Sequence, residues 1–431
     1  MSNLTDLLPA GAGGKQVNFV ASGTLSSGQT VALNGNGTVT AVGTNIAEAL
    51  GTPAIFAGSQ SAMASTFDTD QNKLVVVYAD GDNSDFGTAV VGTVSGTSIS
   101  FGTPVVFETA RATSIAATFD TTTNKVVVIY GDAGNSFNGT AIVGTVSGTS
   151  ISFGSAVVFE AASTSYTSVV YDSTNEKVVV AYTDGGNSNY GTAIVGTVSG
   201  TSISFGTSVI FLSGYAIGTG SVYDASSQKI LVAYRNFSNQ NRGESRVGTV
   251  SGTSISFGSS VTYGGAFEIQ SNTLCAYDSQ SQKIVIAYSS NETSTQYGWA
   301  VVGTISGTSV SYGTRVTFNG NRSNRLAIGY DPTANKVVIA YRNRDISDKG
   351  YLRYGEVSGT SISFSSALLL NDEASATHSL VYANSAAKMV VSSYLATSVD
   401  SQSVTYQPPY SISNTSFIGI TDAAISDTAS G

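Results

Sequence analysis

The chain has 431 residues, of which 19 are Lys or Arg and 28 are Asp or Glu, and it carries a single Cys and a single His. One Cys excludes an internal disulfide, and one His leaves no Cys/His ligand set for a structural zinc. A net charge of -9 without a basic run argues against nucleic acid as a partner, since phosphate binding uses clustered Lys and Arg. No apolar run reaches the roughly 18 residues of a membrane helix, so we expect no membrane insertion.

The first 41 residues differ from the rest of the chain. They begin MSNLTDLLPAGAGGKQ, which lacks the basic and then apolar plan of a signal peptide. Their segment FVASGTLSSGQT, from Phe19, resembles FIGITDAAISDT, from Phe417, in its aromatic, small and apolar positions. We therefore expect residues 1–41 and the C-terminal tail, residues 411–431, to pack together as a small β-module.

Internal repeats fill the region between the tails, residues 42–410. The element VGTVSGTSISFG at Val91 returns unchanged at Val143, Val195 and Val247, and weaker copies follow. A second marker, an aromatic residue followed by Asp and later by Lys, occurs as FDTDQNK from Phe67 and in related forms along the chain. Counting both markers gives seven units of about 52 residues, which is the signature of a repeat architecture.

Each unit is predicted to form four β-strands, because apolar and polar residues alternate between short turn sequences. Seven such units predict an all-β, seven-bladed β-propeller, in which ring closure removes open sheet edges. A vestigial repeat from Val42 to Phe56 has no inner strands of its own, and the last unit, from Ala376, lacks a good outer element. We expect strands from both termini to complete one blade; a β-solenoid is the alternative architecture.

Two further patterns support the propeller. Aromatic residues recur every 52 to 55 residues and are expected to form core rungs between neighbouring units. Three residues before each marker aromatic stands a residue that is small in six of seven units, as a crowded central channel requires. These positions are Ala64, Ala116, Ser168, Gly220, Leu274, Ala327 and Ser379.

Differences between the copies indicate where a ligand binds. The turns between the first and second strands and between the third and fourth strands stay nearly constant, and both lie at one end of a propeller. The turns from second to third strand and the crossovers between units diverge, and both lie at the opposite end, which we call the variable face. Loops that vary on a rigid scaffold are the usual place for binding sites.

Arginine is concentrated in one sector, since nine of ten arginines fall between residues 235 and 353. Guanidinium groups suit carboxylate, sulfate or phosphate ligands and also protein interfaces, whereas the alternative is solvated arginines paired with local acids. The candidate ligand- or partner-binding residues on the variable face are Arg235, Arg242, Arg322, Arg325, Arg342 and Arg344.

Other constellations are weaker. Asp80, Asp82 and Asp85 bring three carboxylates together and are a weak candidate for Ca²⁺, although the loop lacks the later Glu of an EF-hand. No metal or other cofactor is therefore expected. His378 is predicted to lie on the last inner strand as a satisfied polar residue rather than as a base, and Cys275 as a buried, inert thiol.

A glycan hydrolase needs two carboxylates that face each other across a cleft. Acidic residues in the variable segments are Glu108, Glu268, Asp345 and Glu373, but nothing in the sequence pairs them. The sequence therefore predicts that the protein is not an enzyme.

The tails carry a family resemblance. The stretch MSNLTDLLPAGAGGKQVNFVASGTLSSGQTVALNGNGTVTAVG, together with SFIGITDAAISDTASG, resembles the flanks of virion structural proteins, tail-fibre-like or surface-attached, of marine and cyanobacterial phages. The resemblance covers roughly 60 residues and brings no catalytic motif. It implies a virion protein, made in the host cytoplasm and present in several copies or as a homo-oligomer. Its partners would be other virion proteins and a host cell-surface polysaccharide. Docking onto virion proteins without an external ligand, and glycan hydrolysis, are the alternative functions.

Overall fold

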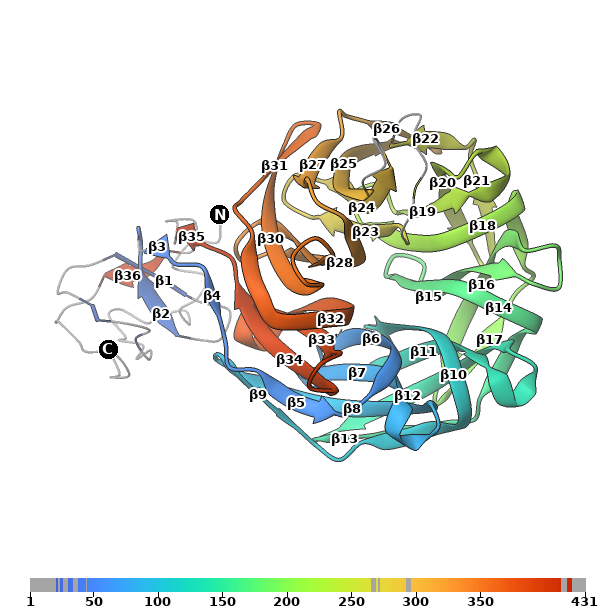
Figure 1. The fold of residues 1–431 in the computed structure, drawn as a ribbon, viewed down its shortest axis with the longest axis horizontal. Coiled ribbons are helices and arrows are strands. Elements are labelled where there is room, and N and C mark those ends of the chain that lie inside the picture. Colours follow the sequence, from blue (N-terminus) through green and yellow to red (C-terminus); the bar gives the residue numbers. More distant parts are fainter. Residues whose placement is uncertain are drawn as a thin grey trace, which may run out of the picture.

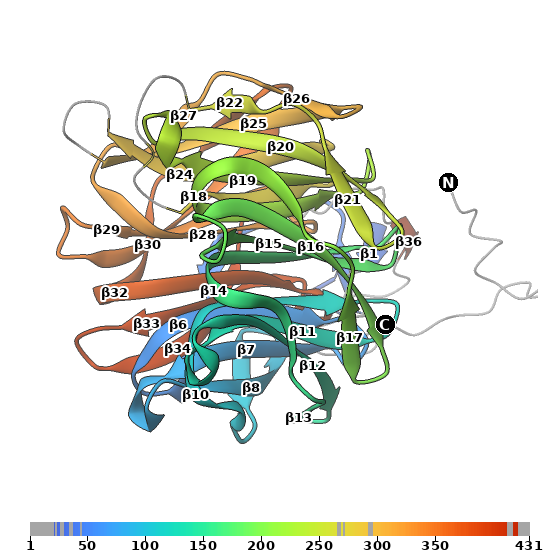
Figure 2. The ribbon, with the colours of Figure 1, turned by 90° about the vertical axis from the view of Figure 1, so that its right-hand side faces the viewer.

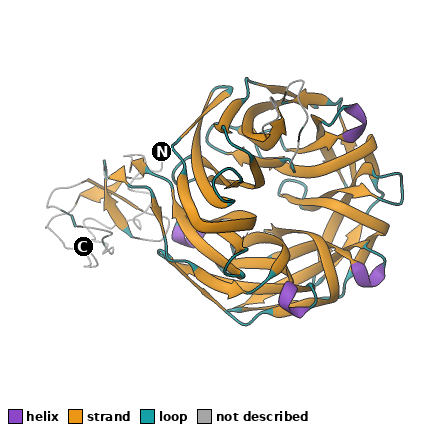
Figure 3. Cartoon of the chain, viewed as in Figure 1, coloured by secondary structure: helices purple, strands orange, loops and turns teal. Residues whose placement is uncertain are grey.

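The computed structural model describes residues 21, 24–25, 30–33, 38–43, 45–264, 269, 272–291, 296–411 and 417–420. Most of this part of the chain is β-structure, and the strands form sheets around a common axis (Figure 1). The all-β propeller predicted from the sequence is confirmed. Short 3-10 helices are present only at turns (Figure 3), and none of the helices in the described segments has the length and apolar character needed to span a bilayer.

Antiparallel pairing places the described strands of the ring in seven sheets, numbered here in chain order. The first sheet contains β6 (Gln60–Asp68), β7 (Lys73–Asp80), β8 (Phe86–Ser95) and β9 (Ser98–Phe101). The second contains β10 (Val105–Asp120), β11 (Lys125–Asp132), β12 (Asn138–Ser147) and β13 (Ser150–Phe153). The third contains β14 (Val157–Asp172), β15 (Lys177–Asp184), β16 (Tyr190–Ser199) and β17 (Ser202–Phe205).

The remaining sheets follow the same order. The fourth contains β18 (Val209–Asp224), β19 (Lys229–Asn236), β20 (Arg242–Ser251), β21 (Ser254–Phe257) and β22 (Val261–Tyr263). The fifth contains β23 (Leu274–Asp278), β24 (Lys283–Asn291), β25 (Gln296–Ser306), β26 (Ser309–Tyr312) and β27 (Val316–Asn319). The sixth contains β28 (Ser323–Asp331), β29 (Lys336–Asn343), β30 (Lys349–Ser358) and β31 (Ser361–Phe364), and the seventh contains β32 (Leu368–Ala383), β33 (Lys388–Leu395), β34 (Asp400–Gln407), β4 (Ala49–Leu50) and β5 (Ala54–Ala57).

Several crossovers expected as loops are continuous strands instead. β10, β14, β18 and β32 each have 16 residues and run from the outer edge of one sheet to the inner edge of the next. In β10 the pairing register shifts between Val106 and Glu108, between Glu108 and Arg111, and between Thr113 and Ala116. Each β-bulge adds a residue and so breaks the period-two alternation, which is why the sequence did not indicate a strand there.

The two ends of the ring differ as the repeats predict. Figure 2 shows the turn between β29 and β30 at one end of the ring and the short strands β17 and β21 at the other. The first end is the variable face. Three of its turns contain 3-10 helices, η2 (Gly81–Asn83), η3 (Ala133–Asn135) and η4 (Phe237–Asn239), while η5 (Asn384–Ala386) lies at the opposite end.

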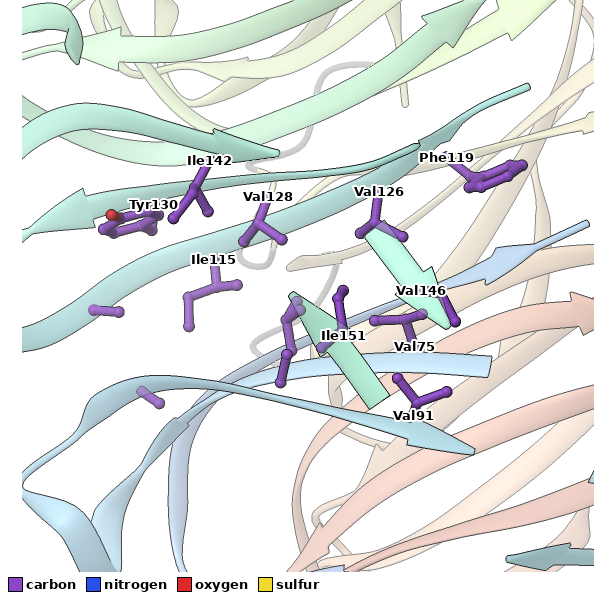
Figure 4. Close-up of a cluster of buried hydrophobic side chains, with 14 residues drawn as sticks. Val75, Val91, Ile115, Phe119, Val126, Val128, Tyr130, Ile142, Val146 and Ile151 are labelled. Carbon is purple, nitrogen blue, oxygen red and sulfur yellow. The ribbon is translucent and has the colours of Figure 1, made fainter. Parts of the chain in front are cut away.

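The core lies between adjacent sheets. In Figure 4, apolar side chains of β7 and β8 face those of β10, β11 and β12, with Val75 and Val91 against Val126 and Val128. The recurrent aromatics are rungs of this core, as predicted: the Phe107 ring lies 5.3 Å from Tyr130 and 5.4 Å from Phe153. Tyr130 also donates a hydrogen bond to Glu108, at 3.0 Å, so its buried hydroxyl is satisfied.

In six of the seven units a buried Asp organises the constant turn after the inner strand, whereas the seventh has Ala383 at this position. In six units the Asp Oδ1 accepts hydrogen bonds from the backbone N–H groups two and three residues later, as Asp172 does from Thr174 and Asn175. Asp331 is fully buried, and its Oδ2 has no hydrogen-bond partner in the described residues. Burial raises the pKa of Asp331 to about 6. The backbone hydrogen bonds from Ala334 and Thr333 and the charge of Lys388 act in the opposite direction, but burial has the larger effect.

Asp331→Asn is expected to stabilise the protein at neutral pH. The carboxyl of Asp331 binds its proton up to about pH 6 in the folded chain but only to about pH 4 when unfolded. Its contribution to stability is therefore present at low pH and is lost as the pH rises through 6. Urea unfolding measures the free energy of unfolding of both proteins at pH 4 and at pH 7. The difference between the variant and the wild type should be about 1–3 kcal/mol more in favour of the variant at pH 7 than at pH 4. The same difference at both pH values would contradict the assignment.

The ring closes in the seventh sheet, which combines strands from the N-terminal and the C-terminal parts of the chain. β34 pairs with β33 on one side and with β4 and β5 on the other, with Gln402 opposite Ile55 and Ser403 opposite Ala54. Phe56 packs 5.5 Å from Tyr78 and 5.3 Å from Phe101 and so fills the rung position of the vestigial repeat. The predicted closure is confirmed.

The tails form two small sheets beside the ring. β1 (Thr30–Leu33) pairs with β2 (Val39–Ala41) and with β36 (Phe417–Ile420), while β3 (Asn45–Ile46) pairs with β35 (Tyr410–Ser411). Joining strands from both ends of the chain confirms the predicted module; most of the two matching tail segments lies outside the described residues. In Figure 2, β1 and β36 lie toward the end of the ring that carries β17 and β21, away from the variable face.

Candidate functional site

A cavity of about 660 Å³ lies on the axis of the ring and is lined by the inner strands of all seven sheets. The small residues predicted to crowd the channel do line it, among them Ala64, Ala116 and Gly220. In the first sheet the lining residues Met63 and Ala64 pair with Tyr78 and Val77, in the half of β7 that leads to the variable turn. The cavity therefore occupies the half of the channel next to the variable face.

A bulge with the same backbone conformation recurs at this point in four of the sheets and carries a different residue in each. Two residues before the small position, Ser114, Tyr166, Gly218 and Arg325 all have a positive φ, between 47° and 60°. Corresponding residues of six sheets line the cavity: Ala62, Ser114, Tyr166, Asn272, Arg325 and Thr377. Among these lining residues Ser114, Tyr166 and Arg325 share the positive φ, so one backbone geometry presents three unlike side chains to a shared space.

Hydrogen bonds between sheets hold this bulge in place. The Thr167 hydroxyl donates to the carbonyl of Ser114, and the Thr219 hydroxyl donates to the carbonyl of Tyr166. In the fourth sheet the Gly218 carbonyl accepts from the backbone N–H of Thr273, at 2.9 Å. The strained backbone is therefore fixed by the scaffold, whichever side chain it carries.

The six predicted arginines fall into two groups. Arg322, Arg325, Arg342 and Arg344 lie together on the sixth sheet, whereas Arg235 and Arg242 belong to the fourth. Arg235 donates to the carbonyl of Ile269, at 3.0 Å, and Arg242 to the Gln240 side chain, at 3.4 Å.

Within the sixth sheet, some guanidinium groups are held by protein side chains and others are free to bind a ligand. Arg322 forms an ion pair with Asp345, at 2.6 Å, and its backbone N–H donates to the same carboxylate. Arg342 Nε donates to Asn324 Oδ1, at 2.8 Å, and lies 3.5 Å from Asp348. Arg325 is exposed, lines the cavity and has no ion pair or hydrogen bond to any residue that the structure describes.

His378 differs from its prediction. It lies on β32 and lines the cavity, as expected, but it is only 8% exposed and neither ring nitrogen has a hydrogen-bond partner in the described part of the chain. The predicted satisfied polar residue is thus unsatisfied. Burial, with added repulsion from Arg342 and Arg325, lowers the pKa of His378 to about 3, so the imidazole is neutral at physiological pH.

Carboxylates are missing from the cavity lining among the described residues. Glu108 accepts from Tyr130, Glu373 accepts from the backbone of Ser398, and Asp345 is paired with Arg322, while Glu268 lies outside the described residues. No pair of acids with the geometry of a two-carboxylate glycosidase therefore faces the cavity in the described part.

Aromatic residues border the cavity on the side of the third and fourth sheets. Tyr166 lines it, and on the fourth sheet the ring of Tyr215 lies 5.5 Å from the exposed ring of Phe237, at an interplanar angle of 49°. Burial and the neighbouring Tyr166 hydroxyl raise the pKa of Tyr215. The variable face therefore has an aromatic side and, three sheets farther along, a cationic side.

The weak calcium candidates have structural partners. Asp80 accepts from the backbone of Asp82 at the start of η2, Asp82 accepts from the backbone of Ser59, at 3.1 Å, and Asp85 accepts from the Ser61 hydroxyl, at 2.8 Å. In the described segments no group of three or more His, Cys, Asp or Glu side chains is arranged to hold a metal ion. Cys275 donates weakly to the Gly220 carbonyl, and burial raises the pKa of its thiol.

Comparison with known proteins supports the fold. No protein-family model matches the sequence, and no curated protein matches it at a significant level. The periplasmic gluconolactonase PpgL of Pseudomonas aeruginosa superposes with a TM-score of 0.55 and 13% identity, over 82% of this chain and 96% of that one. A triple arginine-to-alanine variant of AofleA from Arthrobotrys oligospora gives a TM-score of 0.44 and 10% identity, over 78% of this chain and 94% of that one.

At 13% identity the likeness to the lactonase shows the fold alone. It nevertheless corrects one prediction: that the chain is not an enzyme. A lactonase with the same architecture shows that this fold carries catalysis, so the propeller gives no ground for excluding it.

Proposed function

We propose that this chain is a phage virion protein, a tail-fibre or particle-surface component, whose propeller binds a host cell-surface polysaccharide in the cavity of the variable face. The observation that carries the proposal is the Arg325 guanidinium, which is unpaired among the described residues, at a cavity whose described lining has no carboxylate, in a chain whose acids outnumber its bases. A preformed concave site with few, well-placed polar groups is the common form of a ligand site.

The arrangement of the tails supports a place on a particle. The resemblance to virion proteins lies in the tails, and β1 and β36 are directed away from the variable face (Figure 2). Anchoring through the tail module would leave the cavity free to face the host. Several copies on one particle would turn weak single-site contacts into firm attachment through their high effective concentration.

Arg325→Ser is expected to weaken polysaccharide binding at least tenfold, because a charge-assisted hydrogen bond contributes about 1.5–3 kcal/mol. Serine is a suitable replacement, since Ser114 occupies the same bulge in the second sheet with a φ of 47°. Binding of the full chain to purified host polysaccharide and to whole cells is the measurement, and chromatography of the recovered glycan reports any cleavage.

Arg242→Ser is the matched control, because Arg242 lies on the same face but does not line the cavity. It should leave binding unchanged. Equal losses in both variants, or binding by Arg325→Ser at the wild-type level, would count against the cavity as the site. Absence of wild-type binding to any host polysaccharide or cell would overturn the proposed function.

Docking onto other virion proteins is the second candidate, and the outer rim favours it. Exposed aliphatic side chains recur at one position of the outer strands: Ile55, Val106, Val158, Ile210 and Leu369 are 39–62% exposed. Repeated apolar groups on a surface are typical of protein contacts. If the wild-type protein binds no host polysaccharide, this rim is the surface by which it would act.

A further inference from the structure

Three aromatic residues of the third and fourth sheets form a cluster at the edge of the cavity. Tyr166, on β14, lines the cavity. The hydroxyl of Tyr215, on β18, lies beside the Tyr166 hydroxyl, and the Tyr215 ring lies 5.5 Å from the Phe237 ring. We call these three residues the aromatic cluster. It extends from the cavity onto the surface of the variable face, because Phe237 is 54% exposed.

The repeated fold does not require aromatic residues at these positions. Phe237 is the first residue of η4, whereas η2 begins with Gly81 and η3 with Ala133. Tyr166 occupies the bulge that carries Ser114 in the second sheet. The cluster is therefore particular to this part of the ring, and exposed aromatic rings that folding does not require are typical of ligand and partner contacts.

Hydrogen bonds fix the turn that carries Phe237. Asn236 caps η4 by accepting from the backbone N–H of Asn239, at 3.2 Å. The side-chain amides of Asn236 and Asn239 both donate to Glu244 Oε1, at 3.1 and 2.7 Å, and Glu244 is buried. A ring carried on a fixed turn loses little conformational freedom when a ligand covers it.

The surroundings of the cluster indicate the class of ligand. Ser168 and Asn272, which line the cavity together with Tyr166, carry a hydroxyl and an amide group. A ligand that covers the aromatic rings and continues into this lining needs an apolar face and several hydrogen-bonding groups. A pyranose ring has both, since C–H bonds point to its faces and hydroxyl groups to its edge. A cationic ligand is disfavoured, because the positive charge of Arg235 acts on the Tyr215 hydroxyl.

We propose that the aromatic cluster is a subsite for a pyranose unit of the bound polysaccharide. This inference rests on the proposed function and adds a second contact region to the one at Arg325. The apolar face of the sugar covers the Phe237 and Tyr215 rings, because the face of an aromatic ring is negative and attracts C–H bonds. The hydroxyl groups of the sugar bind the Tyr166 hydroxyl at the edge of the cavity.

Saturation-transfer NMR of the full chain with methyl β-D-glucopyranoside, methyl β-D-galactopyranoside and methyl α-D-mannopyranoside tests the subsite. Saturation of the aromatic protons should pass to the ring C–H protons of at least one glycoside, whereas sorbitol, which has hydroxyl groups but no ring, should receive none. Phe237→Ala should weaken binding of that glycoside by about fivefold or more, because it removes apolar contact area and the stacking contact. The variant should fold, since Ala133 occupies the same turn position in η3. Phe237→Tyr keeps the ring and should bind as the wild type does.

Phe137→Asn is the matched control, because Phe137 is 40% exposed in the corresponding turn of the second sheet and does not line the cavity. Asparagine suits the position, since Asn189 and Asn241 occupy it in the third and fourth sheets with a similar positive φ. This variant should bind the glycoside as the wild type does.

Four results would overturn the subsite: no binding of any of the three glycosides, unchanged binding in Phe237→Ala, equal weakening in Phe237→Ala and Phe137→Asn, or tighter binding of tetramethylammonium than of the glycosides. If the wild type then still binds host polysaccharide, the subsite fails and the proposed function stands; if it binds neither, both fail.

Discussion

Gly154→Ala is expected to lower the free energy of unfolding by about 3 kcal/mol, although the change adds a single methyl group. A Cβ at Gly154 would lie 1.9 Å from the backbone oxygen of Thr201, in the SGTS turn of the next sheet. That oxygen belongs to a tight turn, so neither side of the contact can move without disturbing a hairpin. Urea unfolding monitored by tyrosine fluorescence measures the loss.

Gly320→Ala is the control, since a Cβ there would meet no atom within 4 Å and the backbone φ is not positive. Its unfolding midpoint should stay within the error of the wild type. A comparable stability of the two variants would show that the contact between Gly154 and Thr201 relaxes at little cost.

The repeats themselves support this argument. Gly102, Gly206, Gly258 and Gly313 make the same contact as Gly154, with distances of 1.8–1.9 Å from the built Cβ to the next threonine oxygen. Gly51, in the vestigial repeat, meets Thr97 in the same way, at 2.2 Å. The sixth unit carries Ser365 at this position, and the seventh sheet has no SGTS turn for it to meet.

Phe56→Ala is expected to cost about 3–5 kcal/mol and to loosen the closure of the ring. Phe56 is only 8% exposed and contacts Tyr78 and Phe101, so its removal leaves a cavity beneath β5. Because β5 covers the edge of β34, weaker packing of β5 exposes an unpaired strand. The free energy of unfolding should therefore fall, and amide hydrogen exchange should become faster in β34, around Ser401 to Ser403.

Ile55→Ala is the control that distinguishes the loss of the buried Phe56 ring from a general loss of apolar surface on β5. Ile55 is the neighbour of Phe56 on β5, but its side chain points outward and is 62% exposed. Its replacement should change the unfolding free energy by less than about 0.5 kcal/mol. Unchanged exchange of the β34 amides in Phe56→Ala would show that the closure does not depend on this ring.

The sequence predicted the scaffold well because its signals are local or repeated. The spacing of the aromatic residues indicated the rungs, and small residues such as Ala116 and Ser168 indicated the channel. The rungs and the channel both result from packing between neighbouring units. Because every unit packs in the same way, the same residue pattern occurs several times in one chain. Crossovers such as β10 were missed as strands because their bulges break the alternation on which strand prediction depends.

The site was only partly predictable. Arginine enrichment indicated the sector, but the sequence treated Arg322 and Arg325 alike, whereas an ion pair occupies the first and leaves the second unpaired. Tyr166, Asn272 and Thr377 were not singled out. The sequence did contain a signal for them. Each stands two residues before the channel-lining position of its unit, and the residue at that place differs from unit to unit.

The amino-acid sequence by itself determined the all-β ring, its repeated core and its closure by both ends of the chain, because these follow from residue periodicity and from identity between units. Tertiary structure alone decided which variable residues share one cavity. It placed Arg325 and His378 at the same corner although they are far apart in the chain, because register shifts at the bulges and the meeting of neighbouring inner strands set where each side chain points.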